Sequence, residues 1–289
     1  MRSVQVIDQS SGSTTRAEHV IGVDESGQVV GPEPFALAVV RCPRENSERL
    51  AELLLEHELA PWQAKSQTLV ENATPTERNQ RVQGLMESLT EESIPWGVAV
   101  GRSQESIHHK AAGVCVLAKK TITSVDEFSG DSILIPDGAP SMYGDSQAHL
   151  RTQASQVFDG SFQSTFGGVY VTGLPKADLT YPEVTAADYI AGYVRNRIDE
   201  GTEQVHTLPE EVVRFDTNWR ESSVSPVPFY RIRGVGGDYG TLERTRVAAW
   251  IKGRHPDNDG FDVTSQWENT IQMLESQQLQ RYLLETIVP

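Results

Sequence analysis

Short apolar segments alternate with amphipathic ones between about residue 19 and about residue 200 of the chain. The first two apolar segments are rich in β-branched residues and are separated by a turn that contains Gly and Pro, which is typical of neighbouring buried strands. Strands that alternate with helices predict a layered α/β structure. We expect strands at 19–23, 35–41, 96–100, 132–135 and 167–172.

Helical periodicity is clearest after the third expected strand. Apolar residues recur there at spacings of three and four from Ile107 to Val125, which places them on one face of a helix. A helix start is indicated at Thr74, because the run TPTE combines an N-cap residue, a proline and an acidic first turn. The expected helices are 46–58, 74–89, 107–125, 184–197, 242–252 and 263–287.

The polar segments divide the chain into four regions. Residues 1–18 are polar, contain the run SSGSTT and predict either a loose N-terminal arm or an edge hairpin. Residues 19–200 hold the alternating pattern and are expected to form the core. Residues 201–233 are polar and interrupted by prolines, which indicates an insertion or linker. Residues 234–289 are expected to be helical.

The charge composition is acidic and poor in lysine. The chain of 289 residues has 40 acidic and 25 basic side chains, a net charge of −15, and only six of the basic residues are lysine. This resembles the composition of proteins from salt-loving organisms, but an ordinary acidic cytosolic protein fits it as well. At about 1 M salt the Debye length is only about 3 Å, so net charge does not exclude a polyanionic substrate.

No apolar run approaches the roughly 20 residues that a membrane-spanning helix needs. The N-terminus has no apolar signal segment, and we therefore expect a cytoplasmic protein without a membrane partner. Cys42 and Cys115 form neither a metal-type cluster nor a disulfide framework, so buried free thiols are expected.

Carboxylates follow the predicted strands and one later segment. Asp24 and Glu25 lie in GVDESG, Asp137 lies in IPDG and Asp178 lies in PKAD. Acidic side chains held together at a sheet edge repel one another unless a cation lies between them, and Mg²⁺ and Mn²⁺ prefer oxygen ligands. Two such ions can support phosphodiester cleavage. Each motif taken alone is also compatible with ordinary turn chemistry.

The ordered set of motifs resembles the type 2 ribonucleases H (ribonuclease HII), and in particular their archaeal form. GVDESG resembles the first-strand motif of that family, IPDG its third-acid segment, and PKADLTYPEVTAADYIAGYVRNR its stretch from Lys-Ala-Asp to Arg-Asp. DYGTLERTRVAAWIKGRHP with the later SQWENT is a weaker similarity. Together these motifs extend from residue 20 to about residue 270 in the order of the family.

The resemblance implies a ribonuclease H-like α/β fold, with a mixed central sheet whose first strands are antiparallel, flanking helices and a helical C-terminal segment. It implies a Mg²⁺- or Mn²⁺-dependent endonuclease that cuts the RNA strand of RNA/DNA hybrids, or ribonucleotides embedded in duplex DNA, leaving 5′-phosphate and 3′-hydroxyl ends. Metal binding would fall to Asp24, Glu25, Asp137 and Asp178, with Asp24 and Asp178 bridging or flanking the ions.

The resemblance also assigns residues to the substrate. Lys176 would reach a phosphate, Tyr239 would pack on the sugar at the junction of RNA and DNA, and the loop at Gly27 and Gln28 would contact the nucleic acid. No protein partner is implied, and a monomer is expected.

Several positions depart from the pattern of the family. The arginine of its Gly-Arg-Gly loop is missing after Gly27, Gly192 replaces a lysine and Asp188 replaces a serine. The segment 65–69, KSQTL, lacks the aspartate and one lysine of the corresponding family stretch, and a Pro-Ser-Asp run has become GTL at 240–242. These changes keep two alternatives open: a paralogue with altered nucleic-acid specificity, and a catalytically weak hybrid-binding protein.

Overall fold

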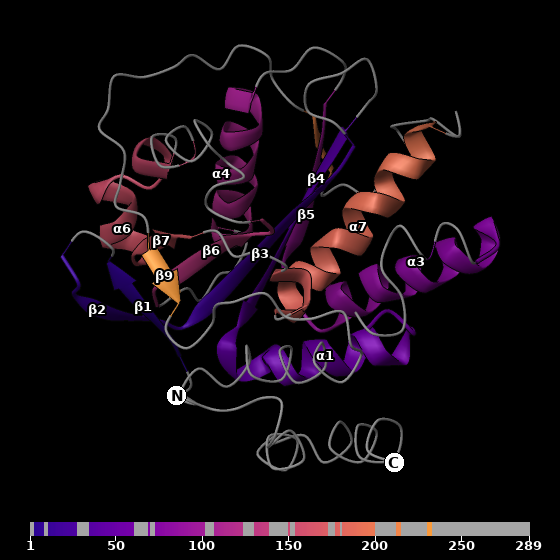
Figure 1. Cartoon of the computed structure of the whole chain (residues 1–289), viewed down its shortest axis with the longest axis horizontal. Helices are drawn as coiled ribbons and strands as arrows, with labels where there is room; N and C mark the ends of the chain where they lie inside the picture. The colour runs from indigo at the N-terminus through magenta and orange to yellow at the C-terminus, as the bar shows by residue number, and fades with distance from the viewer. Residues whose placement is uncertain are drawn as a thin grey trace.

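A six-stranded mixed sheet forms the centre of the protein (Figure 1). The computed structural model describes residues 3–8, 11–27, 35–60, 69, 73–101, 107–123, 130–138, 150, 154–172, 177–179, 181–199, 212–214 and 230–232. Within this part of the chain, helices cover both faces of the central sheet, and a second sheet of three strands lies beside it.

The strand order of the central sheet is β7-β6-β3-β4-β5-β8. Strand β4 pairs antiparallel with both β3 and β5. Three further pairs are parallel: β6 with β3, β7 with β6, and β8 with β5. The expected mixed sheet with antiparallel first strands is therefore confirmed. The strand bounds are β3 His19–Ser26, β4 Phe35–Pro43, β5 Trp96–Gly101, β6 Ser132–Pro136, β7 Val169–Val171 and β8 Val212–Arg214.

Side-chain alternation along β4 divides the core into two layers. Ala36, Ala38 and Val40 contact the cluster formed with α1, α3 and α7, while Leu37 and Val39 contact the cluster formed with α4 and α6. A strand whose successive side chains are all buried must be covered on both faces, which explains its nearly continuous apolar sequence. The helix bounds are α1 Ser47–Glu56, α3 Pro75–Glu91, α4 Ile107–Thr123, α6 Gly160–Phe166 and α7 Pro182–Asp199.

The start of α3 confirms the capping prediction. The Thr74 hydroxyl accepts a hydrogen bond from the backbone N–H of Glu77 at 3.2 Å, and the Glu77 carboxylate accepts one from the backbone N–H of Thr74 at 3.0 Å. This reciprocal pair satisfies two donors that the first helical turn leaves without an internal partner. The helices expected at 46–58, 107–125 and 184–197 are also found, with ends shifted by a few residues.

The N-terminal segment forms a hairpin and not a loose arm. Strands β1 (Val4–Asp8) and β2 (Thr14–Ala17) pair antiparallel, and β9 (Tyr230–Ile232) pairs antiparallel with β1. Val4 and Val6 are fully buried in a cluster shared with the central sheet. The hairpin alternative therefore holds, and β8 and β9 show that the expected insertion at 201–233 contributes strands to both sheets.

Two further expectations can be compared with the structure. Cys42 and Cys115 are both buried free thiols, as expected. None of the described helices has the length and apolar character that crossing a membrane requires. The helices expected at 242–252 and 263–287 lie outside the described residues.

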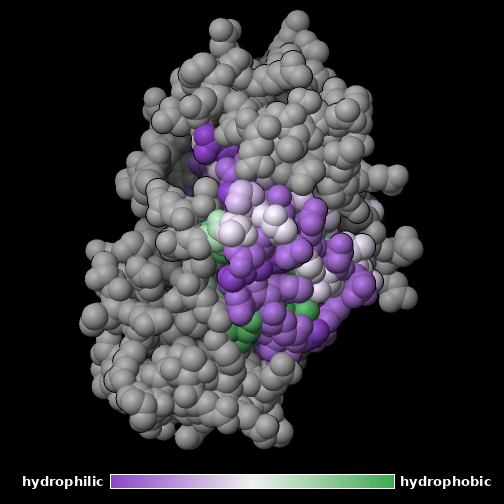
Figure 2. Space-filling model, turned by 90° about the vertical axis from the view of Figure 1, so that its right-hand side faces the viewer, coloured by the Kyte–Doolittle hydropathy of each residue, from purple (hydrophilic) through white to green (hydrophobic). Residues whose placement is uncertain are grey.

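The described surface on the side of α3 and α7, the right-hand side of Figure 1, is mainly hydrophilic (Figure 2).

Candidate functional site

Two neighbouring parallel strands bring the first acidic motifs to one edge of the sheet. In the register of β3 and β6, Val23 is paired with Pro136. The backbone N–H of Asp137 continues this pairing and donates to the carbonyl of Val23 at 3.0 Å. Because Asp24 and Asp137 each follow this last pair, the two residues lie at the same level of the sheet, where β6 has ended and β3 continues beside β4. Glu25 is the next residue of β3.

The segment that contains the fourth predicted acid is attached to the third. The backbone N–H of Ala177 donates to Oδ1 of Asp137 at 2.7 Å. Asp178 follows in the short helix η3 (Ala177–Leu179) and is only 5% exposed. Its carbonyl accepts a hydrogen bond from the Thr185 hydroxyl at 2.6 Å, which ties this turn to α7.

Helix α7 is seated closely on β3 at Gly22. A Cβ atom at this position would lie 2.3 Å from the carbonyl carbon of Glu183 and 2.4 Å from the backbone nitrogen of Val184, so only glycine allows this approach. The buried carboxylate of Glu183 also accepts a hydrogen bond from the Ser47 hydroxyl at 2.6 Å. The first turn of α7 is thereby fixed against the strand that contains Asp24.

The electrostatics of Asp24 reflect a crowded acidic environment. Burial is the largest cause that raises its pKa well above the ordinary range, followed by the negative charges of Asp188, Asp137 and Glu25. The backbone N–H of Glu25 donates to Oδ1 of Asp24 at 2.7 Å and opposes the shift. The negative charges of Asp188, Asp137 and Glu25 therefore act on the carboxyl group of Asp24.

Asp188 is the residue that sequence reasoning missed. Its charge contributes more than that of Asp137 or Glu25 to the pKa of Asp24. From the sequence it was recognised only as a replacement for a serine. The available signal was its spacing of four residues from the apolar Val184, which places both on one face of α7.

The chemistry of these donors fits a hard divalent cation. All the interacting side chains are carboxylates, whose oxygens are the ligands that Mg²⁺ and Mn²⁺ prefer. Among the described residues, no three His, Cys, Asp or Glu side chains are already close enough together to hold a metal ion. Charges act over longer distances than coordination bonds, so carboxylates can affect one another without converging on one point.

Of the substrate-contacting residues expected from the sequence, Gly27 lies in the described part of the chain. Gly27 ends the described part of its loop, and its φ of +95° is a conformation that favours glycine. Gln28, Lys176 and Tyr239 lie outside the described residues.

No protein-family model and no curated protein sequence matches this chain. Solved structures with similar folds include ribonuclease H2 from Pyrococcus horikoshii OT3, with 19% identity over 65% of this chain and 77% of that chain and a TM-score of 0.39. Ribonuclease HIII (Bst) in complex with Mn²⁺ is 18% identical over 63% of this chain, with a TM-score of 0.39. The complex of PCNA with ribonuclease HII from Archaeoglobus fulgidus gives 19% identity over 63% of this chain and 73% of that chain, with a TM-score of 0.37.

The aligned region spans about half, 53%, of the ribonuclease HIII chains. The fold class is established by the central sheet itself. Three antiparallel strands are followed by two strands that extend the sheet in parallel from β3, with helices on both faces. The chain thus has an α/β fold with a mixed central sheet flanked by helices, as the resemblance implied.

Proposed function

We propose that this protein is a divalent-metal-dependent endonuclease that hydrolyses the RNA strand of RNA/DNA hybrids, or ribonucleotides embedded in duplex DNA. The expected products have 5′-phosphate and 3′-hydroxyl ends. The observation that carries the proposal is the position of acidic residues from β3, from the end of β6 and from α7 around the buried Asp24. Burial first, and then the charges of these neighbours, raise the pKa of Asp24. The sequence resemblance to type 2 ribonucleases H supplies the substrate class.

The proposed metal ligands are Asp24, Glu25, Asp137 and Asp178. The chemistry that bound Mg²⁺ or Mn²⁺ supplies at such a site is activation of a water molecule and stabilisation of the leaving oxygen. The chain itself orients the ligands: the Glu25 N–H holds one oxygen of Asp24, and the Ala177 N–H holds one oxygen of Asp137.

The acidic cluster favours an enzyme over a protein that only binds hybrids. Carboxylates that raise the pKa of a buried neighbour destabilise the folded protein when all are ionised. Binding to a nucleic acid does not require such a cost, since the phosphate backbone attracts basic groups. A cation held between the carboxylates removes the repulsion.

Substrate recognition in the proposal depends on the loop at Gly27 and Gln28 and on Lys176 and Tyr239. The arginine expected after Gly27 is missing, which favours the alternative that the enzyme selects its nucleic acid differently from the family that it resembles. The proposal therefore treats hybrid cleavage and junction cleavage as separate activities.

A cleavage assay with two labelled duplexes tests the function. One duplex contains a single ribonucleotide in DNA and the other is a continuous RNA/DNA hybrid, each incubated with Mn²⁺ or Mg²⁺ at low and at molar salt. Asp24→Asn should lower cleavage by about 100-fold or more, the range seen when a metal site loses one of its determinants. Glu91→Gln, an exposed change of the same kind at the end of α3, is the matched control and should cut like the wild type.

The pattern of products decides between the alternatives. Cutting at the single ribonucleotide shows that junction recognition does not need the missing arginine, whereas cutting of the hybrid alone shows altered specificity. Binding of the duplexes without any cleavage would leave only the hybrid-binding alternative. Equal cleavage by Asp24→Asn and the wild type would remove Asp24 from the site.

A further inference from the structure

Asp188 lies on the face of α7 that is turned toward the sheet. Val184 is fully buried, and its backbone nitrogen lies where a Cβ atom at Gly22 would be only 2.4 Å away. Residues four apart on a helix lie one above the other, so Asp188 follows Val184 along the same side, and the fully buried Ala191 comes next. Asp188 itself is partly exposed, because it lies beyond the point where α7 and β3 are in closest contact.

The strand beneath α7 presents Asp24 on the matching side. Gly22 and Asp24 are two residues apart in β3 and therefore point to the same face of the sheet, the face on which α7 lies. Two residues of strand span about 6.6 Å and four residues of helix span about 6 Å, so equal advances from the contact at Gly22 bring Asp24 and Asp188 to the same level.

We propose that Asp188 supplies an additional carboxylate to the metal site at this edge, in the place where the family that the sequence resembles has a serine. This inference rests on the proposed function, because the metal site is part of that proposal. A serine is neutral, whereas an aspartate adds a negative charge and two oxygens beside Asp24. The expected consequence is tighter binding of a divalent cation and stronger repulsion when the cation is absent.

The electrostatics of the edge agree with this placement. The charge of Asp188 acts on Asp24, as do the charges of Asp137 and Glu25, so Asp188 lies within electrostatic range of that carboxyl group.

Titration of the full-length protein with Mn²⁺ tests the role of Asp188. Binding is measured by the loss of the electron paramagnetic resonance signal of free Mn²⁺, and thermal unfolding is followed with and without the ion. The variants are Asp188→Asn and Asp188→Ser. The matched control is Asp199→Asn, the same chemical change at the last residue of α7, about 16 Å further along the helix.

We expect both Asp188 variants to bind Mn²⁺ at least tenfold more weakly than the wild type. They should also unfold at a higher temperature than the wild type when no divalent ion is present, and the rise in unfolding temperature that Mn²⁺ gives should shrink. Asp199→Asn should keep the Mn²⁺ affinity of the wild type within twofold. A purely structural role of Asp188 predicts the opposite sign, a lower unfolding temperature without the ion.

The results separate this inference from the proposed function. If Asp24→Asn abolishes Mn²⁺ binding and cleavage while Asp188→Asn leaves the affinity within twofold, the inference is overturned and the nuclease stands. If Mn²⁺ binding depends on Asp188 but the wild type cuts neither duplex, the inference stands and the nuclease does not. A wild-type protein that binds no Mn²⁺ overturns the inference as well.

Discussion

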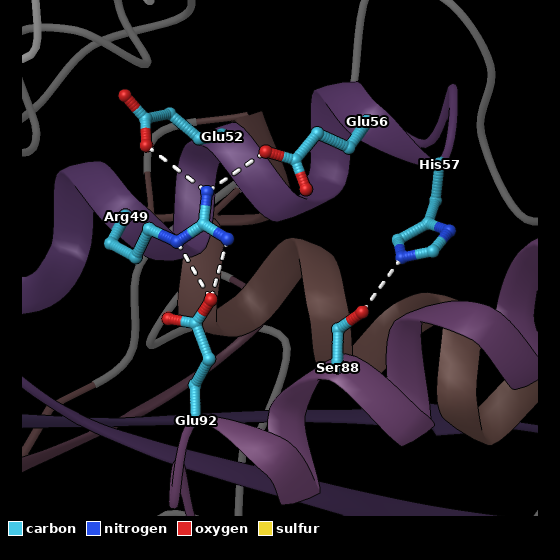
Figure 3. Close-up of polar contacts among 6 residues, drawn as sticks. All are labelled: Arg49, Glu52, Glu56, His57, Ser88 and Glu92. Atoms are coloured by element: carbon cyan, nitrogen blue, oxygen red, sulfur yellow. Dashed lines mark hydrogen bonds and ion pairs between the residues drawn. The ribbon is translucent and has the colours of Figure 1, made fainter.

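Two acidic regions of this protein differ in the charges that surround their carboxylates. On the outer helices, Arg49 lies among three glutamates: its Nη1 donates to Glu52 at 3.2 Å and to Glu56 at 2.8 Å, and its Nε donates to Glu92 at 2.8 Å (Figure 3). At the sheet edge, the neighbouring charges that most affect Asp24 are other carboxylates. The chain supplies its own cation in the first region, whereas in the second region we propose that a bound metal ion supplies it.

The difference shows how position determines the use of an acidic residue. The Arg49 group connects α1 to the end of α3 at the surface, where Arg49 is 39% exposed and solvent weakens each ion pair. Burial is the largest cause that raises the pKa of Asp24, so like charges there are more costly and a bound cation is more valuable. An acidic sequence alone does not distinguish these two cases.

The largest expected effect on stability comes from disrupting the close contact between α7 and β3. Gly22→Ala places a methyl group 2.3 Å from the backbone of Glu183, and the backbone cannot move aside as a flexible side chain can. We expect a loss of about 3 kcal/mol or more in the free energy of unfolding, at the upper end for an overpacked core. Urea unfolding followed by circular dichroism measures it, and loss of Mn²⁺ binding should accompany it.

Gly160→Ala is the control for this substitution. Gly160 begins α6, and a Cβ atom there meets nothing within 4 Å. The same chemical change should therefore leave stability unchanged within about 0.5 kcal/mol. A Gly22→Ala protein as stable as this control would show that α7 is not held closely against β3.

The second prediction concerns the pH dependence of the acidic edge. The pKa of Asp24 is raised in the folded state, so between about pH 4, its ordinary range, and that raised value the folded protein holds more protons than the unfolded chain. This contribution to stability is present at low pH and is lost as pH rises. Without divalent ions, Asp24→Asn should be more stable than the wild type at pH 8 by about 1–2 kcal/mol.

His19 gives stability a pH dependence of the opposite sign, which must be separated from that of Asp24. Burial and the charge of Arg41 lower its pKa to about 4, so its contribution to stability is lost as pH falls from about 6.5 toward 4. Both proteins contain His19, and the difference between the wild type and Asp24→Asn cancels its effect. A difference that is independent of pH, or unaffected by saturating Mg²⁺, would contradict the electrostatic account of Asp24.

Part of the candidate site could be predicted from the sequence because it depends on local structure. Asp24 and Asp137 directly follow apolar segments that could only be buried strands, and parallel neighbours end at the same edge. Asp178 is singled out by its motif PKAD as well, but no strand precedes it directly, and its role as a metal ligand comes from the resemblance alone. The proposed role of Asp188 depends on how α7 is rotated and placed against Gly22, which is a tertiary contact, so its spacing from Val184 in the sequence does not assign that role.

The fold, like the site, could be predicted from the sequence only where a local pattern determines the structure. The central strands and α3 were predictable from apolar runs and a capping sequence. Helix α6 was missed because its seven residues, GSFQSTF, are too few and too polar to show a period; Asp159 caps it by accepting from the Phe162 N–H at 2.9 Å. The pairing of β9 with β1 joins segments more than 200 residues apart, and no local pattern announces it.

A smaller effect is expected when the Arg49 group loses its cation. Arg49→Gln removes the ion pairs to three glutamates, and each exposed pair is worth about 0.2–1 kcal/mol. We expect a total loss of about 1 kcal/mol at low salt that shrinks at molar salt, because these charges are screened. Thermal unfolding at the two salt concentrations measures it. A loss that persists at molar salt would indicate that Arg49 contributes through packing and not through charge.

The smallest effect is expected at Gly84, which offers a second test of how closely elements approach. A Cβ atom at Gly84 of α3 would lie 2.7 Å from the ring of His57, but here the obstacle is a side chain (Figure 3 shows His57 beside α3). Gly84→Ala gains up to about 1 kcal/mol of helix propensity and loses a comparable amount if the His57 ring must leave Ser88, whose hydroxyl lies 3.0 Å from Nε2. The free energy of unfolding should therefore change by less than about 0.5 kcal/mol. His57→Ala in the same background should reveal the helix gain, because it removes the obstacle. A loss at Gly84 as large as that at Gly22 would mean that the ring of His57 cannot move, and that outer and central helices are equally rigid.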